Sequence, residues 1–242
     1  MSLCGDSSTA ELPLFQGGDG GAIPTSPLQL KFRSISNYTA NLVAVESHYA
    51  HRKAPITWSF GAYFNEKLLG IITFGKPPSQ HLCIGVCGRE HQERVYELNR
   101  LWMDDKCPKN SESRFIGWAL REIKKINPNI VLVSYADTEQ NHIGTIYKST
   151  NWIYTGITKP VLEYQVKGLK MHSKTVSNSV KKSNENKDKK TMLKELYGDK
   201  FFMKERSQKH RFVYFFNQND KNLLKWKQEP YPNNLKQDSN SL

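Results

Sequence analysis

The chain has 242 residues, of which 38% are hydrophobic and 11% aromatic, a composition typical of a globular protein with one sizeable core and a smaller appendage. No apolar run approaches the roughly 20 residues that span a bilayer, residues 1–21 lack the features of a secretory signal, and four scattered cysteines are too few for a disulfide framework. We therefore exclude a membrane-spanning or disulfide-stabilised secreted protein, and expect no membrane partner and a cytoplasmic location.

The net charge of +12 is unevenly distributed along the chain. Residues 165–242 hold 18 Lys and Arg against 8 Asp and Glu, a net charge of +10, which leaves +2 for residues 1–164. A nearly neutral body with a basic C-terminal third indicates a catalytic core that carries an arm for a polyanion. The charge alone is equally compatible with a solvated tail that keeps the protein soluble.

The first expected elements along the chain are a strand, a helix and a β-hairpin, in that order. Ser36 provides a helix cap, and His48 and Tyr49 fall at the end of that helix. Two apolar runs separated by a tight polar turn have the pattern of a β-hairpin. The expected elements are a strand at 30–36, a helix at 36–49, and hairpin strands at 58–65 and 67–75.

The middle of the chain alternates between strands and helices. The apolar residues of 111–126 keep helical spacing, and residues 129–136 form a continuous apolar run of the buried-strand type. Alternation of this kind predicts a mixed α/β sheet with crossover helices. The expected elements are strands at 94–103, 129–136 and 152–156, and helices at 111–126 and 143–150.

Beyond residue 164 the composition changes. Residues 176–190 are almost entirely Ser, Asn and Lys, which predicts a flexible loop. A short helix at 191–197 and an apolar strand at 210–216 follow, and we expect this strand to return to the main sheet. The predicted organisation is an irregular segment at 1–28, a catalytic core at 29–164, a basic insertion at 165–209, the returning strand at 210–216 and a tail at 217–242.

From residue 94 onward the order of elements resembles the GNAT N-acyltransferase fold. In that fold, backbone amides at a helix N-terminus hold the pyrophosphate of acyl-coenzyme A, because unpaired amides and the helix dipole favour an anion. Residues 110–117 (NSESRFIG) take this position, without the paired glycines and early basic residue of the usual pattern. The resemblance implies cofactor contacts from Asn110, Ser111, Ser113 and Arg114, although Ser111 or Ser113 is also able simply to cap the helix.

A second GNAT-like feature is the helix and turn of residues 143–156 (IGTIYKSTNWIYTG). Tyr147 stands where many GNAT enzymes place the general acid that protonates the leaving thiolate. The alternative for Tyr147 is a core aromatic on an amphipathic helix.

Several longer blocks, in the same order along most of the chain, resemble the Mom family of Mu-like bacteriophages. A further group of blocks matches near the start and in the basic third, and residues 181–190 are the least similar to the family. The blocks are 97–105 (ELNRLWMDD), 111–118 (SESRFIGW), 132–138 (LVSYADT), 142–147 (HIGTIY), 151–156 (NWIYTG), 24–30 (PTSPLQL), 171–178 (MHSKTVSN) and 209–215 (KHRFVYF).

The Mom resemblance implies conversion of adenine in DNA to N6-methylcarbamoyladenine, which protects phage DNA from host restriction enzymes. It also implies binding of acetyl-CoA and of iron. Ordinary acyl transfer needs an amine, a thioester, an oxyanion donor and an acid for the thiolate. That scheme delivers an acetyl group, so the extra nitrogen of the methylcarbamoyl group demands a rearrangement or another donor.

For iron, the resemblance points to His48, Tyr49 and Asp137, whose imidazole, phenolate and carboxylate are suitable ligands. In a GNAT-like fold the helix end and the strand end that carry them meet at the acyl end of the cofactor. Adjacent helical residues point about 100° apart, so His48 and Tyr49 both bind the metal only where the helix has frayed. A capping or substrate-contacting role stays open for both.

Arg100 lies on the strand that lines the cofactor groove in a GNAT-like fold. Its positive charge is suited to an acyl oxygen or a DNA phosphate, and the alternative is a salt bridge to Glu97 or Asp104. We include Arg100 with Tyr147, His48, Tyr49 and Asp137 among the candidate catalytic residues.

Double-stranded DNA is the expected partner, and a paired adenine must be flipped out of the helix before its amino group is accessible. Trp58, Trp102, Trp152 and Tyr154 are available to stack the base, and the sequence does not choose among them. Basic residues of the C-terminal third supply phosphate contacts. The expected set is Lys170, His172, Lys174, Lys181, Lys182, Lys204, Arg206, Lys209 and Arg211.

Two other functions stay open at this stage. A conventional GNAT enzyme that acetylates a protein or a small-molecule amine would keep the cofactor loop and Tyr147 but has no need of a basic insertion. A non-enzymatic DNA-binding protein on a decayed GNAT fold would explain the degenerate phosphate loop.

Overall fold

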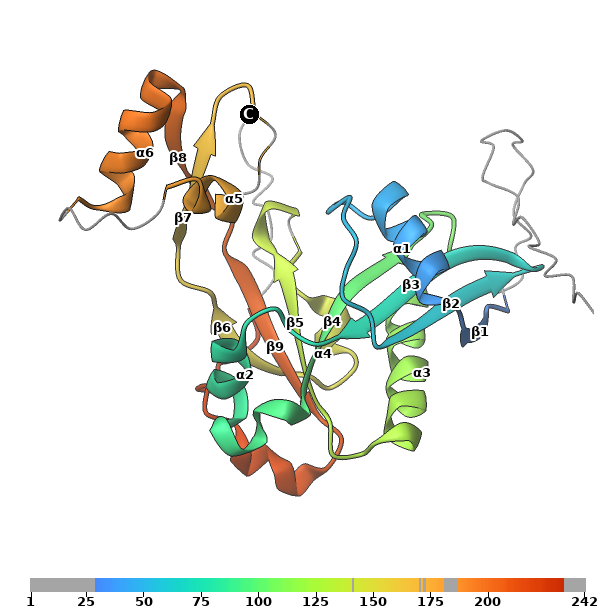
Figure 1. The fold of residues 1–242 in the computed structure, drawn as a ribbon. Coiled ribbons are helices and arrows are strands. Elements are labelled where there is room, and N and C mark those ends of the chain that lie inside the picture. The colour runs from blue at the N-terminus through green and yellow to red at the C-terminus, as the bar shows by residue number, and fades with distance from the viewer. Residues whose placement is uncertain (1–28, 141, 170, 172, 181–186, 233–242) are drawn as a thin grey trace, which may run out of the picture.

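A seven-stranded mixed sheet forms the centre of the computed structural model, which describes residues 29–232 except 141, 170, 172 and 181–186. The strand order is β1-β2-β3-β4-β5-β9-β6 (Figure 1). Its strands are β1 (Lys31–Ser34), β2 (Trp58–Phe64), β3 (Lys67–Gly75), β4 (Val95–Met103), β5 (Val131–Asp137), β6 (Ile153–Ile157) and β9 (Lys209–Phe215).

The strands β4 and β5 form the parallel pair of an otherwise antiparallel sheet. Parallel neighbours need a long crossover connection, which α3 (Ser111–Ile126) supplies. The pairing begins at Val95↔Val131 and ends at Leu98↔Ser134, although β4 continues to Met103 and β5 to Asp137. The two strands therefore separate toward their carboxyl ends, and this separation positions the site described below.

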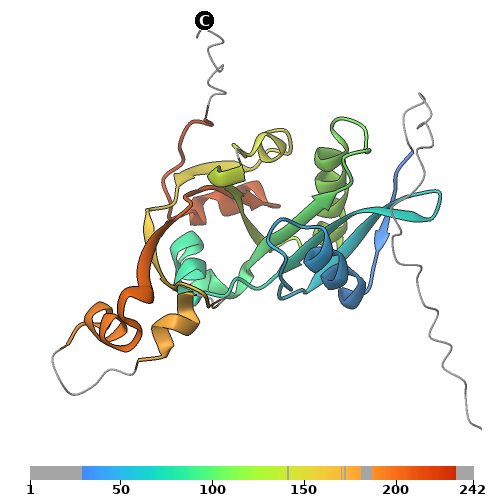
Figure 2. The ribbon, with the colours of Figure 1, turned by 90° about the horizontal axis from the view of Figure 1, so that it is seen from above.

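Helices cover both faces of the sheet. The face with α3 and α4 (Thr145–Lys148) holds the larger core, where Phe115, Ile116 and Tyr147 are buried. The other face packs against α2 (Gln80–Cys87) and the 3-10 helix at Gln218–Leu223. Figure 2 shows α1 (Asn37–Glu46) on the side of the sheet opposite α3.

The strands β7 (Val161–Val166) and β8 (Phe201–Arg206) pair with each other in a separate two-stranded sheet. Together with α5 (Ser173–Asn178) and α6 (Lys189–Tyr197) they form what we call the basic module, the described parts of residues 161–206. Its core consists of Val166, Val176 and Leu193. In Figure 1 the module projects from the end of the sheet at which β5 ends.

The mixed α/β class predicted from the sequence is confirmed, including the helix at 111–126. Three features differ from expectation. The core does not extend to residue 164, because β7 begins at Val161 and pairs with β8. The ends of the predicted loop at 176–190 are helical, because α5 extends to Asn178 and α6 begins at Lys189, while residues 181–186 of that prediction lie outside the described residues. The helix α2 was not expected.

Candidate functional site

A cavity of about 690 Å³ lies where β4 and β5 separate. We call it the β4–β5 cavity, and its volume falls within the roughly 300–1,000 Å³ of small-ligand sites. Its walls come from the segment after α1, the second half of β4, the end of β5 and the segment that leads into α4. The lining residues with polar or aromatic side chains include His48, Tyr49, Asn99, Arg100, Trp102, Asp105, Glu112, Tyr135, Gln140, His142 and Tyr147.

His48 and Tyr49 reach this cavity together because α1 ends before them. The last helical residue is Glu46, and Ser47 caps the helix by donating its backbone N–H to Val43. Freed from helical spacing, the two rings stack with centroids 4.3 Å apart and planes 29° apart. The His48 side of the stack is buried, with 5% exposure, whereas Tyr49 is 47% exposed.

The hydrogen bonding of His48 determines which ring nitrogen carries its proton. Its Nδ1 accepts a hydrogen bond from the backbone N–H of Ala50 at 3.0 Å, so this nitrogen holds a lone pair. Burial, reinforced by the positive charge of Arg100, lowers the pKa of His48 to about 4. The imidazole is therefore neutral at pH 7 with its proton on Nε2, which makes Nε2 a hydrogen-bond donor.

Arg100 lines the cavity, whereas Glu97, three residues earlier on β4, is not among its lining residues. The Arg100 guanidinium donates to the carbonyl oxygens of Arg52 and Asn99. Within the described residues it forms no salt bridge to Glu97 or Asp104, although its charge reaches Glu97. Burial raises the pKa of Glu97 to about 7, and the charges of Arg100 and Lys209 offset this only in part. Glu97 is therefore a half-ionised carboxylate near neutral pH.

Tyr147 is 5% exposed and lies between the core and the cavity. Its ring stacks on Phe212 at 4.7 Å, and its hydroxyl is hydrogen-bonded to the Ser134 hydroxyl at 2.8 Å. Burial raises the pKa of Tyr147, so the phenol stays protonated and is able to donate a proton. The structure shows the core role considered for Tyr147, and the acid role stays a prediction.

Asp137 does not line the cavity, because its carboxylate is turned to the strand beside it. Its Oδ2 lies 3.0 Å from Nζ of Lys209, and its Oδ1 accepts the backbone N–H of Glu139 at 3.1 Å. Burial acts to raise the pKa of Asp137, but hydrogen bonds from Ser207, Lys209 and Glu139 outweigh it and the pKa is lowered. Asp137 therefore joins β5 to β9 as an ionised, fully partnered group.

The donor set expected for iron does not fit a metal site. A histidine that ligates a metal usually donates its other ring N–H to an acceptor, whereas Nδ1 of His48 accepts a hydrogen bond. Both Asp137 oxygens are engaged. Across the part of the chain that the structure describes, no group of three or more His, Cys, Asp or Glu residues is placed to hold a metal ion.

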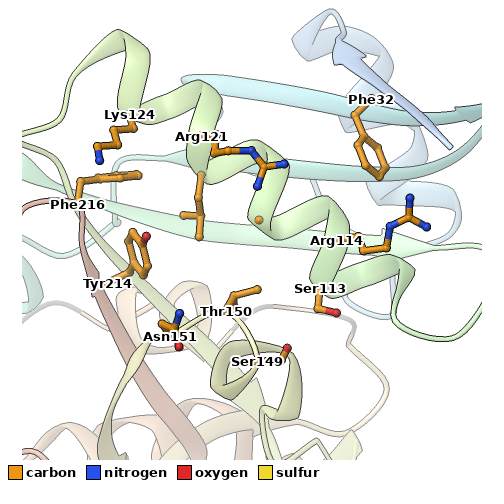
Figure 3. Close-up of a pocket in the computed structure, with 12 residues that line it drawn as sticks. Phe32, Ser113, Arg114, Arg121, Lys124, Ser149, Thr150, Asn151, Tyr214 and Phe216 are labelled. Carbon is orange, nitrogen blue, oxygen red and sulfur yellow. The ribbon is translucent and has the colours of Figure 1, made fainter.

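A second cavity of about 560 Å³ runs along α3 and is called here the α3 cavity. Figure 3 shows Arg114, Arg121 and Lys124 along one side of the helix, opposite Ser149 and Thr150 at the end of α4. Phe32, Tyr214 and Phe216 add aromatic rings to its lining. Cations, hydroxyls and rings together suit a phosphorylated nucleotide.

The start of α3 offers a further anion-binding feature. Asn110 precedes the helix in a left-handed conformation, with φ of 68°, and its side chain makes no cap. The Ser111 hydroxyl is buried and finds no hydrogen-bond partner among the described residues. Ser113 instead donates its hydroxyl to the carbonyl of Asn110 at 3.1 Å. The backbone N–H of Ser111 donates to the carbonyl of Pro108 at 3.1 Å, so among the described residues the amides of Glu112 and Ser113 are those left for an external anion in the first turn of this 16-residue helix.

The residues expected to contact DNA fall into three groups. Lys170, His172, Lys181 and Lys182 lie outside the described residues. Lys174 and Lys204 are exposed on the basic module, and Arg206 lies 3.6 Å from Glu163. By contrast, Lys209 pairs with Asp137, and Arg211 donates to Thr155 and lies over the ring of Trp226 at 3.7 Å. These last two cations are used within the fold.

The basic module joins the sheet beside the β4–β5 cavity. Thr138, directly after β5, donates its backbone N–H and its hydroxyl to the carbonyl of Gln208. Gln208 in turn donates its side-chain amide to the carbonyl of Thr158 at 2.7 Å. Both chain segments that connect the module are therefore fixed at the end of β5, close to Gln140 and His142 of the cavity wall.

Sequence reasoning missed Glu97 as a functional group, treating it only as a partner of Arg100. It also missed Arg121, Lys124 and Gln140. The spacing of Arg114, Arg121 and Lys124 at seven and three residues places them on one face of a helix, a signal that was present in the sequence. No local pattern marks Glu97, because its burial comes from distant elements.

A family model and a curated relative both point to the Mom family. The Mom protein family matches residues 29–233, which is most of the chain. Methylcarbamoylase mom of Escherichia phage Mu is 26% identical over 166 residues, covering 68% of each protein. No helix of the described residues is long and apolar enough to cross a membrane.

Among solved structures, the similar ones include two acetyltransferases. An N-acetyltransferase from Staphylococcus aureus Mu50 has a TM-score of 0.43 and 12% identity, covering 78% of this chain and 99% of that one. The putative acetyltransferase YncA from Salmonella typhimurium, solved with its cofactor acetyl-CoA, has a TM-score of 0.43 and 10% identity, covering 78% and 95%. The match over residues 29–233 decides the assignment, and the chain belongs to the Mom protein family.

Proposed function

We propose that this protein is a DNA-modifying transferase that converts adenine in DNA to N6-methylcarbamoyladenine and so protects the DNA from restriction enzymes. The observation that carries the proposal is the β4–β5 cavity, which brings His48, Arg100 and Tyr147 together in a protein of the Mom family. The similarity to a methylcarbamoylase supports the class of group transferred.

Acetyl-CoA is the proposed donor-side cofactor. Its pyrophosphate would bind the free amides and the unpartnered Ser111 hydroxyl at the start of α3, and its nucleotide would occupy the α3 cavity beside Arg121 and Lys124. When bound, the cofactor would supply the thioester carbonyl and its methyl carbon, whereas the methylcarbamoyl nitrogen requires a second donor or a rearrangement. The roles given below concern only the attack on the carbonyl and the release of the thiol. Iron is not part of the proposal, because His48 and Asp137 are already hydrogen-bonded in ways that do not suit ligands.

The protein's own groups have distinct roles in this proposal. Glu97 does not line the cavity, but burial raises its pKa to about 7, and it would accept the proton of the attacking adenine amine through intervening water. The Nε2–H of His48 would donate to the carbonyl oxygen as negative charge develops there. Protonated Tyr147 would deliver a proton to the leaving sulfur.

DNA is the proposed acceptor because of the position of the basic module. Exposed Lys174 and Lys204 belong to a module whose two connections end beside the cavity. Phosphate contacts there would hold the duplex while one adenine is extruded toward the cavity. The location in this scheme is the cytoplasm of a bacterial host.

The test is expression of the full chain in bacteria, followed by digestion of plasmid DNA to nucleosides and mass spectrometry. The expected result is a nucleoside heavier than deoxyadenosine by one methylcarbamoyl group, absent from cells with an empty vector. Plasmid resistance to restriction enzymes should rise in parallel. A mass increase of one acetyl group would instead indicate ordinary acetyl transfer, and unmodified adenine despite abundant folded protein would refute the proposal.

A further inference from the structure

The stacked pair of His48 and Tyr49 presents one free aromatic face at the β4–β5 cavity. His48 is 5% exposed and Tyr49 is 47% exposed, and both line the cavity. With their centroids 4.3 Å apart, His48 covers one face of the Tyr49 ring and leaves the other accessible. A flat ring supported from behind is the arrangement that stacks a nucleobase.

We propose that Tyr49 is the platform on which the acceptor adenine stacks and that Gln140 reads the edge of that base. The inference rests on the proposed function, because it takes a DNA base as the acceptor. It assigns Tyr49 to substrate binding through its ring, and not through its hydroxyl.

Other aromatic residues are committed elsewhere. Trp152 is 1% exposed and packs on Tyr147 and Tyr214, and Trp58 packs against Tyr96 in the core. The hydroxyl of Tyr154 is hydrogen-bonded to Nδ1 of His210 at 2.9 Å. Of the four aromatics that the sequence left undecided, Trp102 alone lines the cavity.

Gln140 is suited to recognise adenine because its side-chain amide is free to pair. It ends the 3-10 helix Thr138–Gln140, is exposed, and lines the cavity. Its amide makes no hydrogen bond to another described residue, whereas the amide of Asn99 is used by Thr73 and Pro55. A carboxamide offers a donor and an acceptor side by side, the complement of N7 and the amino group of adenine.

Both parts of the proposal predict effects that depend on the base and not on the phosphate backbone. Loss of one base–aromatic stack corresponds to about a 5- to 150-fold loss of affinity. Tyr49→Phe keeps the ring and should bind as the native protein does. Tyr49→Ala and Tyr49→Leu remove the ring, the second while keeping apolar volume, and both should weaken binding.

The experiment measures binding of fluorescein-labelled single strands to the full-length protein by anisotropy. The probes are an oligodeoxyadenylate, an oligodeoxythymidylate and an abasic strand of equal length, which keeps the phosphates and lacks the bases. Tyr38→Ala is the matched control, because Tyr38 is 74% exposed on α1 and does not line the cavity. Thermal unfolding of each variant verifies the fold.

The expected result is a loss of at least fivefold for oligodeoxyadenylate with Tyr49→Ala and Tyr49→Leu, unchanged abasic binding, and native behaviour of Tyr49→Phe and Tyr38→Ala. Gln140→Ala should reduce the preference for oligodeoxyadenylate over oligodeoxythymidylate. The proposal is overturned if Tyr49→Phe binds as weakly as Tyr49→Ala, or if Trp102→Ala alone abolishes base-dependent binding. Binding is measured without cofactor, so it does not depend on catalysis. If the protein binds bases through Tyr49 as expected but leaves DNA unmodified, the proposed function is refuted and the role of Tyr49 in base binding stands.

Discussion

The seven-stranded sheet and the basic module differ in the size of their cores and in where they keep their charges. The sheet buries two large apolar clusters, and Glu97, Asp137 and His48 lie among or beside them with shifted pKa values. The module buries three apolar side chains and leaves Lys174 and Lys204 exposed. A group whose protonation must be tuned needs burial, whereas a group that meets phosphates needs exposure.

Variants in the sheet and variants in the basic module are therefore expected to behave differently. Changes in the sheet should act on the pH profile and the rate of reaction, with little influence on salt dependence. Changes in the module should act on DNA affinity and salt dependence, and should leave the chemistry intact. Four variants test the division, beginning with the largest expected effect.

Replacement of Glu97 by Gln should reduce the rate of DNA modification by about 10²- to 10⁴-fold, because it removes the proposed proton acceptor. In the native protein the rate should rise with pH around 7, where this carboxyl loses its proton, and the residual rate of the variant should lack that step. The measurement is the initial rate of modification between pH 6 and 8.5. Glu93→Gln is the control, since Glu93 is exposed and pairs with Lys76.

The pH dependence of thermal stability separates the proposed catalytic role of Glu97 from a merely structural one. The folded-state pKa of Glu97 is raised from 4.5 to about 7, so the folded protein binds the extra proton and loses stability as pH rises through that interval. Glu97→Gln should therefore unfold at a higher temperature than the native protein at pH 8. A variant that is inactive and also less stable at pH 8 would contradict the assignment.

The next largest effect is expected from Leu193→Ala in the basic module. Leu193 is fully buried in a three-residue core, and truncating such a side chain costs about 2–5 kcal/mol of unfolding free energy. The module should unfold locally while the sheet remains folded, so DNA affinity should fall about tenfold or more with CoA binding retained. Hydrogen exchange and DNA binding check this, with exposed Leu196→Ala as the control.

The elements that the sequence predicted well are those whose pattern is local. Residues 111–126 formed the expected helix because their apolar side chains repeat on one face, and the apolar run at 210–216 became β9, which lies between β5 and β6. By contrast, β7 and β8 pair only with each other and alternate weakly between buried and exposed positions. The short helix α2 contains Gly85 two residues before its last residue, which weakens its helical signal.

Part of the candidate cavity lining could be named from the sequence, although Asp137 of the same set does not line the cavity and Gln140 was missed. Family resemblance named His48, Tyr49, Arg100 and Tyr147, which the structure brings to one cavity. It could not reveal that Nδ1 of His48 accepts a hydrogen bond, or that Lys209 neutralises Asp137 from a strand 72 residues later in the chain. Protonation states depend on such distant neighbours, which no local motif encodes.

Removal of Arg121 should weaken CoA binding by about fivefold, because an exposed ion pair with a phosphate contributes about 1 kcal/mol. Arg121 lines the α3 cavity and is solvent-exposed. Calorimetric titration of Arg121→Ala with CoA provides the measurement. Lys125→Ala serves as the control, because Lys125 pairs with Glu122 and lies outside the cavity. Equal affinity in the two variants would place the nucleotide elsewhere.

The smallest effect, and the sharpest separation of the two regions, is expected from Lys204→Gln. Lys204 is exposed on β8, and loss of one phosphate contact reduces the slope of log affinity against log salt by about 1. DNA binding measured between 50 and 200 mM salt should show this reduction, while the pH profile of modification stays native. Lys227→Gln should leave the slope unchanged, because Lys227 lies outside the module and pairs with Glu229. If Lys227 rather than Lys204 sets the slope, the duplex follows the C-terminal segment and the module has another role.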